Sequence, residues 1–268
     1  MQLPITTGEG RSRGWAQVGK GIRGLVISYA ITVLLWYVLG LRMGPDIFPN
    51  PLRTLVAVGK ILSNVNLIKH VGITFGRTVA GVLVSMFIAA AAVIAARYWS
   101  PFRYYFLKVF YPGMRAIPPV AVALLAIVWF GLGSGTVIFV IVITVLPIYM
   151  IDLWEGMKVI DSTLVEMATV LTSNRTRILK KVVLPMLVPV LFASTKLSFS
   201  VAFKLALVGE LLGATSGMGF MVYLSQQEYK TDMVFAWTFL LVMLVVFFEY
   251  YVFDVTERKY LYKWQTEK

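Results

Sequence analysis

Long apolar stretches recur along the whole chain, and they decide what it can fold into. A helix needs about 20 predominantly apolar residues to cross the hydrocarbon core of a bilayer, with a range of about 17 to 25. Three stretches clearly meet this requirement, at residues 24–41, 78–96 and 235–253. The sequence therefore predicts an integral membrane protein and not a soluble domain.

Three further apolar stretches are shorter or interrupted by charge. They cover residues 117–130, 136–151 and 187–207. The composition agrees with a membrane location, because 59% of the residues are hydrophobic and 14% are charged, against about 45–50% apolar and about 25% charged residues in soluble domains. We therefore expect an all-α integral membrane fold with six transmembrane helices.

The flanking segments divide the chain into three parts. Residues 1–23 form a basic N-terminal tail, residues 24–257 the transmembrane domain and residues 258–268 a C-terminal tail. No small-residue cleavage site follows the first apolar stretch, so we expect a span there and not a signal peptide. With a cytoplasmic N-terminus, the inner segments hold seventeen Lys and Arg residues and the outer segments far fewer. The positive-inside rule then predicts that both termini are cytoplasmic.

The charge and the rare residue types exclude several functions. The net charge is +12, but the cations lie at the ends of apolar spans instead of on one basic face, so we expect contact with membrane lipid and no nucleic-acid partner. The chain has no cysteine, which excludes disulfides, thiol catalysis and thiolate metal sites. His70 is the only histidine. It is expected at the surface, where it offers no cluster for a metal or for acid–base catalysis.

Local signals mark structure between the spans. Asn50 followed by Pro51 has the form of an N-cap and a first helical residue, which predicts a surface helix after the first span. Residues 131–134 form a glycine-rich turn so short that the flanking helices must be antiparallel neighbours. Gly217 and Gly219 are expected in a turn and not in a phosphate-binding loop, because no Lys-Ser or Lys-Thr follows them.

The loop between the fourth and fifth spans, residues 152–186, is longer than a simple connection requires. Apolar residues recur there every three or four positions and predict a short amphipathic helix; they are Leu164, Met167, Ala168 and Leu171. Pro185 then begins the fifth span. The residues themselves leave two interpretations open: the helix docks a partner protein, or it lies on anionic lipid.

This loop contains a spaced motif made of Glu166, Met167, Ala168, Thr172, Val182, Leu184 and Pro185. The motif resembles the EAA loop of bacterial ABC importer permeases. The family pattern is Glu-Ala-Ala, three residues, Gly, nine residues, Ile, one residue and Leu-Pro. Every spacing is met, while Met167, Thr172 and Val182 replace the alanine, the glycine and the isoleucine of that pattern.

Other segments match the branch of this family that carries nitrate, sulfonates, taurine and bicarbonate. They are residues 48–51, 117–119, 129–133, 209–213 and 217–219. The resemblance implies a type I permease fold in the bacterial inner membrane, with a cytoplasmic coupling helix between the fourth and fifth transmembrane helices. It also implies three kinds of partner: two cytoplasmic ATPase subunits, a second permease that is identical or a paralogue, and an external solute-binding protein. ATP and Mg would be held by the ATPase subunits, so this chain would bind no cofactor and catalyse no reaction.

The same resemblance assigns the residues expected to couple the permease to the ATPase. They are Glu166, Met167, Ala168, Leu171, Thr172, Ser173, Arg175, Leu184 and Pro185. For the translocation path, the candidates are Lys204, Lys196 and Glu210, because a cation inside a span needs a partner or an aqueous wall. We expect Lys204 to favour an anionic solute. The alternatives are that it snorkels to the interface or pairs with Glu210.

The predicted function is therefore the transmembrane permease subunit of an ATP-driven importer for a small, anionic solute. A gradient-driven secondary transporter or channel subunit is the alternative, and inverted repeats or paired acidic groups within spans would favour it. Neither is convincing in this sequence. A membrane-embedded enzyme would need converging nucleophile, acid and base groups, and a single histidine with no cysteine argues against it.

Overall fold

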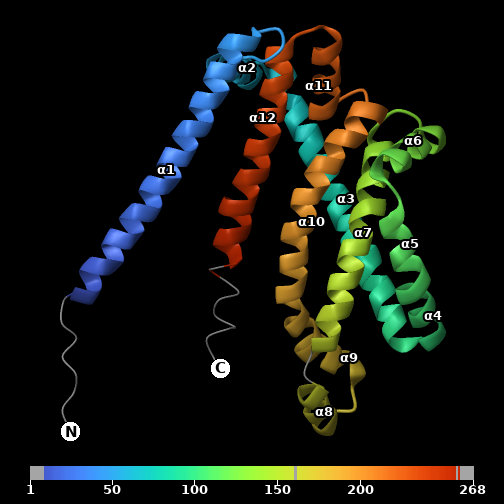
Figure 1. Cartoon of the computed structure of the whole chain (residues 1–268). Coiled ribbons are helices and arrows are strands. Elements are labelled where there is room, and N and C mark those ends of the chain that lie inside the picture. The colour runs from blue at the N-terminus through green and yellow to red at the C-terminus, as the bar shows by residue number, and fades with distance from the viewer. Residues whose placement is uncertain (1–8, 160–161, 258, 260–268) are drawn as a thin grey trace.

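The computed structural model describes residues 9–159, 162–257 and 259. Every regular element in these residues is a helix (Figure 1). By length and composition, five of the described helices can cross a membrane, or six if one bent pair is counted as a single span. The prediction of an all-α fold with about six transmembrane helices is confirmed.

The helices form a bundle with two distinct ends, which we name by the short helices found there (Figure 1). The α11 end carries α2 (Pro51–Ser63), α6 (Pro119–Phe130) and α11 (Met218–Gln227). The α8 end carries α8 (Ser162–Leu171) and α9 (Arg175–Ile178).

The first helix, α1 (Glu9–Met43), begins inside the segment expected to be a polar tail. Only 6% of its apolar segment Val26–Met43 is buried. Helix α1 diverges from the other helices along its length in Figure 1. At the α11 end it is tied to the chain, because Trp36 Nε1 donates a hydrogen bond to the Pro49 carbonyl oxygen at 3.0 Å. The expected tail residues 1–8 lie outside the described residues.

Helix α2 begins as the sequence predicts. The Asn50 side chain accepts a hydrogen bond from the Arg53 N–H at 2.9 Å, and Pro51 occupies the first turn. The helix is not simply a surface helix, because its apolar face packs on Trp237 of α12 (Thr231–Phe247). Ala57 and Ile61 are fully buried in that contact.

The second span corrects the predicted boundary. Helix α3 runs from Val65 to Tyr98, so it begins well before the expected residue 78. Lys69 and Arg77, which come before the expected start at residue 78, lie within this helix. Hydropathy missed its first turns because they carry polar side chains, which the helix tolerates through partners described below.

The third predicted span, residues 117–130, corresponds to α6, whose 12 residues are fewer than a membrane crossing needs. The chain before it is helical as well. Helix α3 is followed by α4 (Ser100–Tyr105), the π-helical segment η1 (Phe106–Phe110) and α5 (Tyr111–Ala116). The segments Arg103–Ala116 and Pro119–Phe130 then meet at an angle of 88°. The cause is local: Ile117 is extended, as a residue before proline prefers to be. The glycine-rich turn at 131–133 then brings α6 against its expected neighbour α7.

The centre of the bundle is α7 (Ser134–Val159), which packs against both α3 and α10 (Leu184–Gly213). At two places glycine lets the helices approach closely. A Cβ on Gly81 of α3 would lie 2.5 Å from Ile141 Cγ2, and a Cβ on Gly156 of α7 would lie 2.7 Å from Val190 Cγ1 of α10. At each place a side chain of one helix packs directly on the glycine backbone of the other.

The remaining elements complete the loops and the last span. Helix α9 continues into the π-helical η2 (Leu179–Val183), and α10 then begins with Pro185 in its first turn, as predicted. Helix α12 continues into η3 (Phe248–Asp254). Helix α11, between the last two spans, had no counterpart among the predicted elements.

Candidate functional site

The segment predicted to couple to a partner protein forms a short helix at the free tip of the α8 end (Figure 1). Helix α8 contacts α9 and η2. Its large described apolar side chains are uncovered: Met167 is 60% exposed, Val170 87% and Leu171 85%. Such an apolar surface on a polar loop is expected to bind something.

Local hydrogen bonds fix the turn that leaves α8. Thr172 Oγ1 accepts a hydrogen bond from the Asn174 N–H at 3.2 Å, and Asn174 Oδ1 accepts one from the Arg177 N–H at 3.1 Å. A glycine at 172 would lack the first of these bonds. The threonine that departs from the family pattern therefore stabilises the turn into α9.

The other predicted coupling residues are distributed around this tip. Glu166 and Ser173 are exposed, while Ala168 and Pro185 are half-buried. The side chains of Arg175 and Leu184 lie outside the described part of the structure. The first residues of the predicted loop 152–186 are helical, because α7 extends to Val159.

A second cluster, at the α11 end, is centred on a buried ion pair that sequence reasoning missed. Arg77 Nη1 of α3 donates to Glu210 Oε1 of α10 at 2.7 Å, and the two side chains are 5% and 0% exposed. Arg77 also donates to the Ser134 hydroxyl at 3.0 Å and to the Ser216 carbonyl oxygen at 2.6 Å. One guanidinium thus joins α3, α7, α10 and the turn before α11.

The first turn of α11 is held by the same cluster. The N–H groups of Gly217, Met218 and Gly219 donate in order to His70 Nδ1, Thr74 Oγ1 and Glu210 Oε2, at 3.0, 2.8 and 2.9 Å. These N–H groups have no partner within their own helix. We name Arg77, Glu210, Thr74 and His70 the α11 clamp.

The α11 clamp corrects two expectations about single residues. His70 is not a free surface residue, because it accepts a hydrogen bond from Gly217 and its ring lies edge-on to Trp237. Glu210 is paired with Arg77 and not with Lys204. The turn at Gly217, predicted correctly, has a φ of 107°, which favours glycine.

Lys196 and Lys204 of α10 lie in different surroundings. Lys196 forms ion pairs with Asp254 and with Glu257, and its side chain is 28% exposed. Lys204 is exposed and forms no ion pair or hydrogen bond with any residue that the structure describes. The structure therefore does not bring Lys204, Lys196 and Glu210 together.

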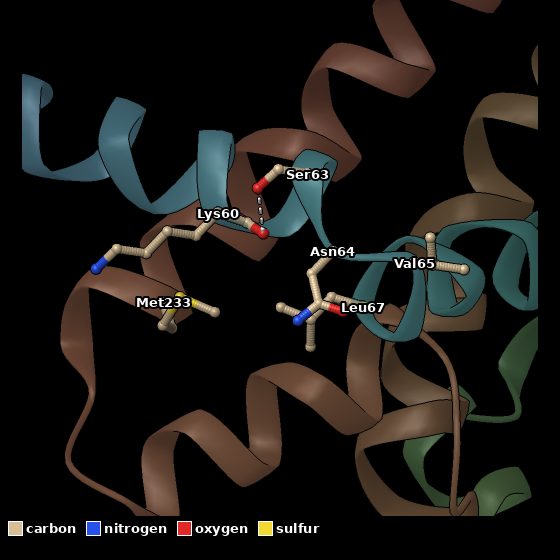
Figure 2. A pocket seen from close by; sticks show the side chains of 6 residues that line it. All are labelled: Lys60, Ser63, Asn64, Val65, Leu67 and Met233. Carbon is tan, nitrogen blue, oxygen red and sulfur yellow. Dashed lines mark hydrogen bonds between the residues drawn. The ribbon is translucent and has the colours of Figure 1, made fainter.

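A pocket of about 610 Å³ lies where α2, α3 and α12 meet (Figure 2). It is lined by Lys60, Ser63, Asn64, Val65, Leu67 and Met233. Lys60 is the one ionisable side chain among these six residues, so they provide no paired acid and base. Among the described residues, no group of three His, Cys, Asp or Glu residues could hold a metal ion.

Known proteins resemble the chain over most of its length. Residues 88–259 match the family model described as "Binding-protein-dependent transport system inner membrane component". A putative aliphatic sulfonates transport permease protein of Bacillus subtilis is 28% identical over 244 residues, which cover 87% of this chain and 85% of the relative.

Two further relatives match over a shorter segment. The riboflavin transport system permease protein of Chloroflexus aurantiacus is 35% identical over 122 residues, 45% of each chain. The taurine transport system permease protein of Escherichia coli is 29% identical over 122 residues, which cover 46% of this chain and 44% of the relative.

Proposed function

Because the chain belongs to the family of inner membrane components of binding-protein-dependent transport systems, we propose that it is the permease subunit of an ATP-driven importer for a small anionic solute. The observation that carries this proposal is the family match over residues 88–259, which includes α7, α8, α10, α12 and the end of α3. The match confirms the predicted family of importer permeases and does not favour the gradient-driven alternative.

Helix α8 is the coupling helix in this proposal. Its support is the uncovered apolar surface of Met167, Val170 and Leu171 at the tip of the bundle. A groove in an ATPase subunit would cover these side chains, with Glu166 at the edge of the contact. Helix α9 connects α8 to α10, the fifth span, so a displacement of α8 is transmitted to α10.

The complete transporter contains partners that this chain does not supply. Two cytoplasmic ATPase subunits hold ATP and Mg, a second permease forms the other half of the path, and an external binding protein delivers the solute. The α8 end and both termini face the cytoplasm of a bacterial inner membrane. Support comes from Arg177, Lys180 and Lys181, which lie next to α8, since cytoplasmic segments retain positive charge.

The solute is proposed from the relatives and from the path residues. The relatives include permeases for aliphatic sulfonates and for taurine, although a riboflavin permease is among them as well. Lys204 contributes a positive charge to the path. Lys196 and Glu210 border it from within their ion pairs, where they hold α10 in place.

Co-purification tests the coupling helix. The tagged chain is expressed in its native host with and without Glu166→Arg, extracted in mild detergent and assayed for bound proteins and ATP hydrolysis. Glu228→Arg is the matched control, because Glu228 is an exposed glutamate at the opposite end of the bundle. An ATPase should co-purify with the wild type and with Glu228→Arg, and be lost or uncoupled in Glu166→Arg.

Two outcomes contradict the proposal. If the wild type is isolated alone, without nucleotide-dependent activity, the gradient-driven alternative takes its place. If all three proteins retain the ATPase equally, α8 is not the docking helix and the interpretation as a lipid-bound helix is favoured.

A further inference from the structure

Three cations lie well inside the five unbroken spans that the structure describes, and they differ in whether the chain provides them with a partner. Arg77 is paired with Glu210, and Lys196 with Asp254 and Glu257. Lys204 is exposed and has no ionic or hydrogen-bonding partner among the described residues. The fold therefore pairs Arg77 and Lys196 with carboxylates and leaves Lys204 to be neutralised by a group outside the described residues.

Lys204 lies at a depth where lipid is an unfavourable neighbour. It stands nine residues before Gly213, the last residue of the 185–213 span, which corresponds to about 13 Å along the helix axis. Charged side chains at such depth face a water-filled cavity or a partner instead of the acyl chains.

The surroundings of Lys204 on α10 show which face is uncovered. Phe199, Ala202 and Phe203 point into the core of the bundle. Leu197 is 55% exposed, and Ser200 is half-buried, one turn before Lys204. Because residues four apart share a helix face, Ser200 and Lys204 form a polar site on the uncovered side of α10.

We propose that Lys204, with Ser200 beside it, is the contact point for the oxyanion group of the solute in the translocation path. This inference rests on the proposed function, because it requires a path along α10. The ammonium group has three donors on a flexible stem, so it can follow an anion that moves past it. Arg77 cannot do so, since Ser134, Ser216 and Glu210 fix its guanidinium.

The natural absence of cysteine permits a direct test. Ser200→Cys introduces a single thiol next to Lys204. In membranes that contain the assembled transporter, its reaction rate is measured with anionic 2-sulfonatoethyl methanethiosulfonate and with the cationic trimethylammonioethyl reagent. The thiol should react with both, and the ratio of anionic to cationic rates should fall about tenfold when Lys204→Met is added, since one charge about 6 Å away acts oppositely on the two reagents. Lys204→Arg should preserve the ratio.

The controls separate this inference from the proposed function. Leu34→Cys, exposed on the apolar part of α1, should react slowly, and Leu197→Cys is a second reporter if Ser200→Cys is not produced. No reaction at either α10 thiol, or a ratio unchanged by Lys204→Met, overturns the inference. ATPase co-purification is measured on the same samples. If the ATPase does not co-purify with the parent chain, which has no cysteine, that result overturns the proposed function instead.

Discussion

The α11 clamp and helix α8, at opposite ends of the bundle, are built in opposite ways. At the α11 end, the α11 clamp gives the buried carboxylate of Glu210 and three backbone N–H groups partners within the chain. At the α8 end, large apolar side chains are left uncovered. The difference teaches that the α11 clamp is completed by folding, whereas α8 is left to be completed by assembly. Substitutions at the first should therefore reduce stability, and those at the second should reduce binding.

The largest expected effect comes from breaking the ion pair. Arg77→Met leaves Glu210 buried without its cation and should lower the free energy of unfolding by about 3–5 kcal/mol. Thermal unfolding in detergent measures this loss. Adding Glu210→Gln should recover part of it, because the uncompensated charge is then removed. An unchanged melting temperature in Arg77→Met would show that the clamp is not a stabilising unit.

A smaller loss is expected from crowding the first turn of α11. The Cβ of Gly219→Ala would lie 2.5 Å from the Leu207 carbonyl oxygen and 2.7 Å from Glu210 Cβ. Overpacking of this kind costs about 1–3 kcal/mol. Gly72→Ala on α3 is the matched control, since no heavy atom lies within 4 Å of its added Cβ. Equal melting temperatures for the two variants would contradict the close packing of this turn.

The ion pair of Lys196 is more exposed than that of Arg77 and should contribute less to the free energy of unfolding. Lys196 and Asp254 are 28% and 24% exposed, so Lys196→Met should cost about 1 kcal/mol or less. Raising the salt concentration should reduce the difference from the wild type. A loss as large as that of Arg77→Met would mean that this partly exposed ion pair stabilises the fold as strongly as the α11 clamp does.

The smallest effect on stability is expected at α8 itself. Leu171→Gln changes a side chain that is 85% exposed, and surface substitutions usually lie within about 0.5 kcal/mol of the wild type. The same variant should bind the ATPase less tightly in the co-purification assay. If it instead unfolds the protein, α8 belongs to the core and the comparison of the two ends fails.

The sequence predicted local features better than distant ones. The start of α2 was correct because Asn50 and Pro51 act on their own turn. Pro118 and Pro119 mark the break in the sequence, but a count of apolar residues takes no account of where a proline interrupts a helix. The start of α3 was missed because polar residues such as Arg77 resembled a loop. Their partner Glu210 lies 133 residues away along the chain, and no local pattern could indicate it.

The candidate sites followed the same rule. The position of the helix around Glu166 was predicted from spacing, and the structure confirms a helix there. The exposure of Val170 and the turn fixed by Thr172 depend on how α8, α9 and η2 meet, which spacing does not determine. His70 was expected at the surface because nothing next to it in the sequence indicates its hydrogen bond. The donor is the N–H of Gly217, which lies just before α11.

The close glycine contacts of Gly81 and Gly156 make the bundle mechanically stiff. Two facing layers of flexible side chains could absorb a displacement by changing rotamers, whereas the β-branched Ile141 and Val190, which pack on these glycines, have one strongly preferred χ1 rotamer in a helix. Helices α3, α7 and α10 therefore tilt together as one lever. With 30 residues, α10 is about 45 Å long, so a tilt of about 5° at the α8 end would move the α11 end by about 4 Å.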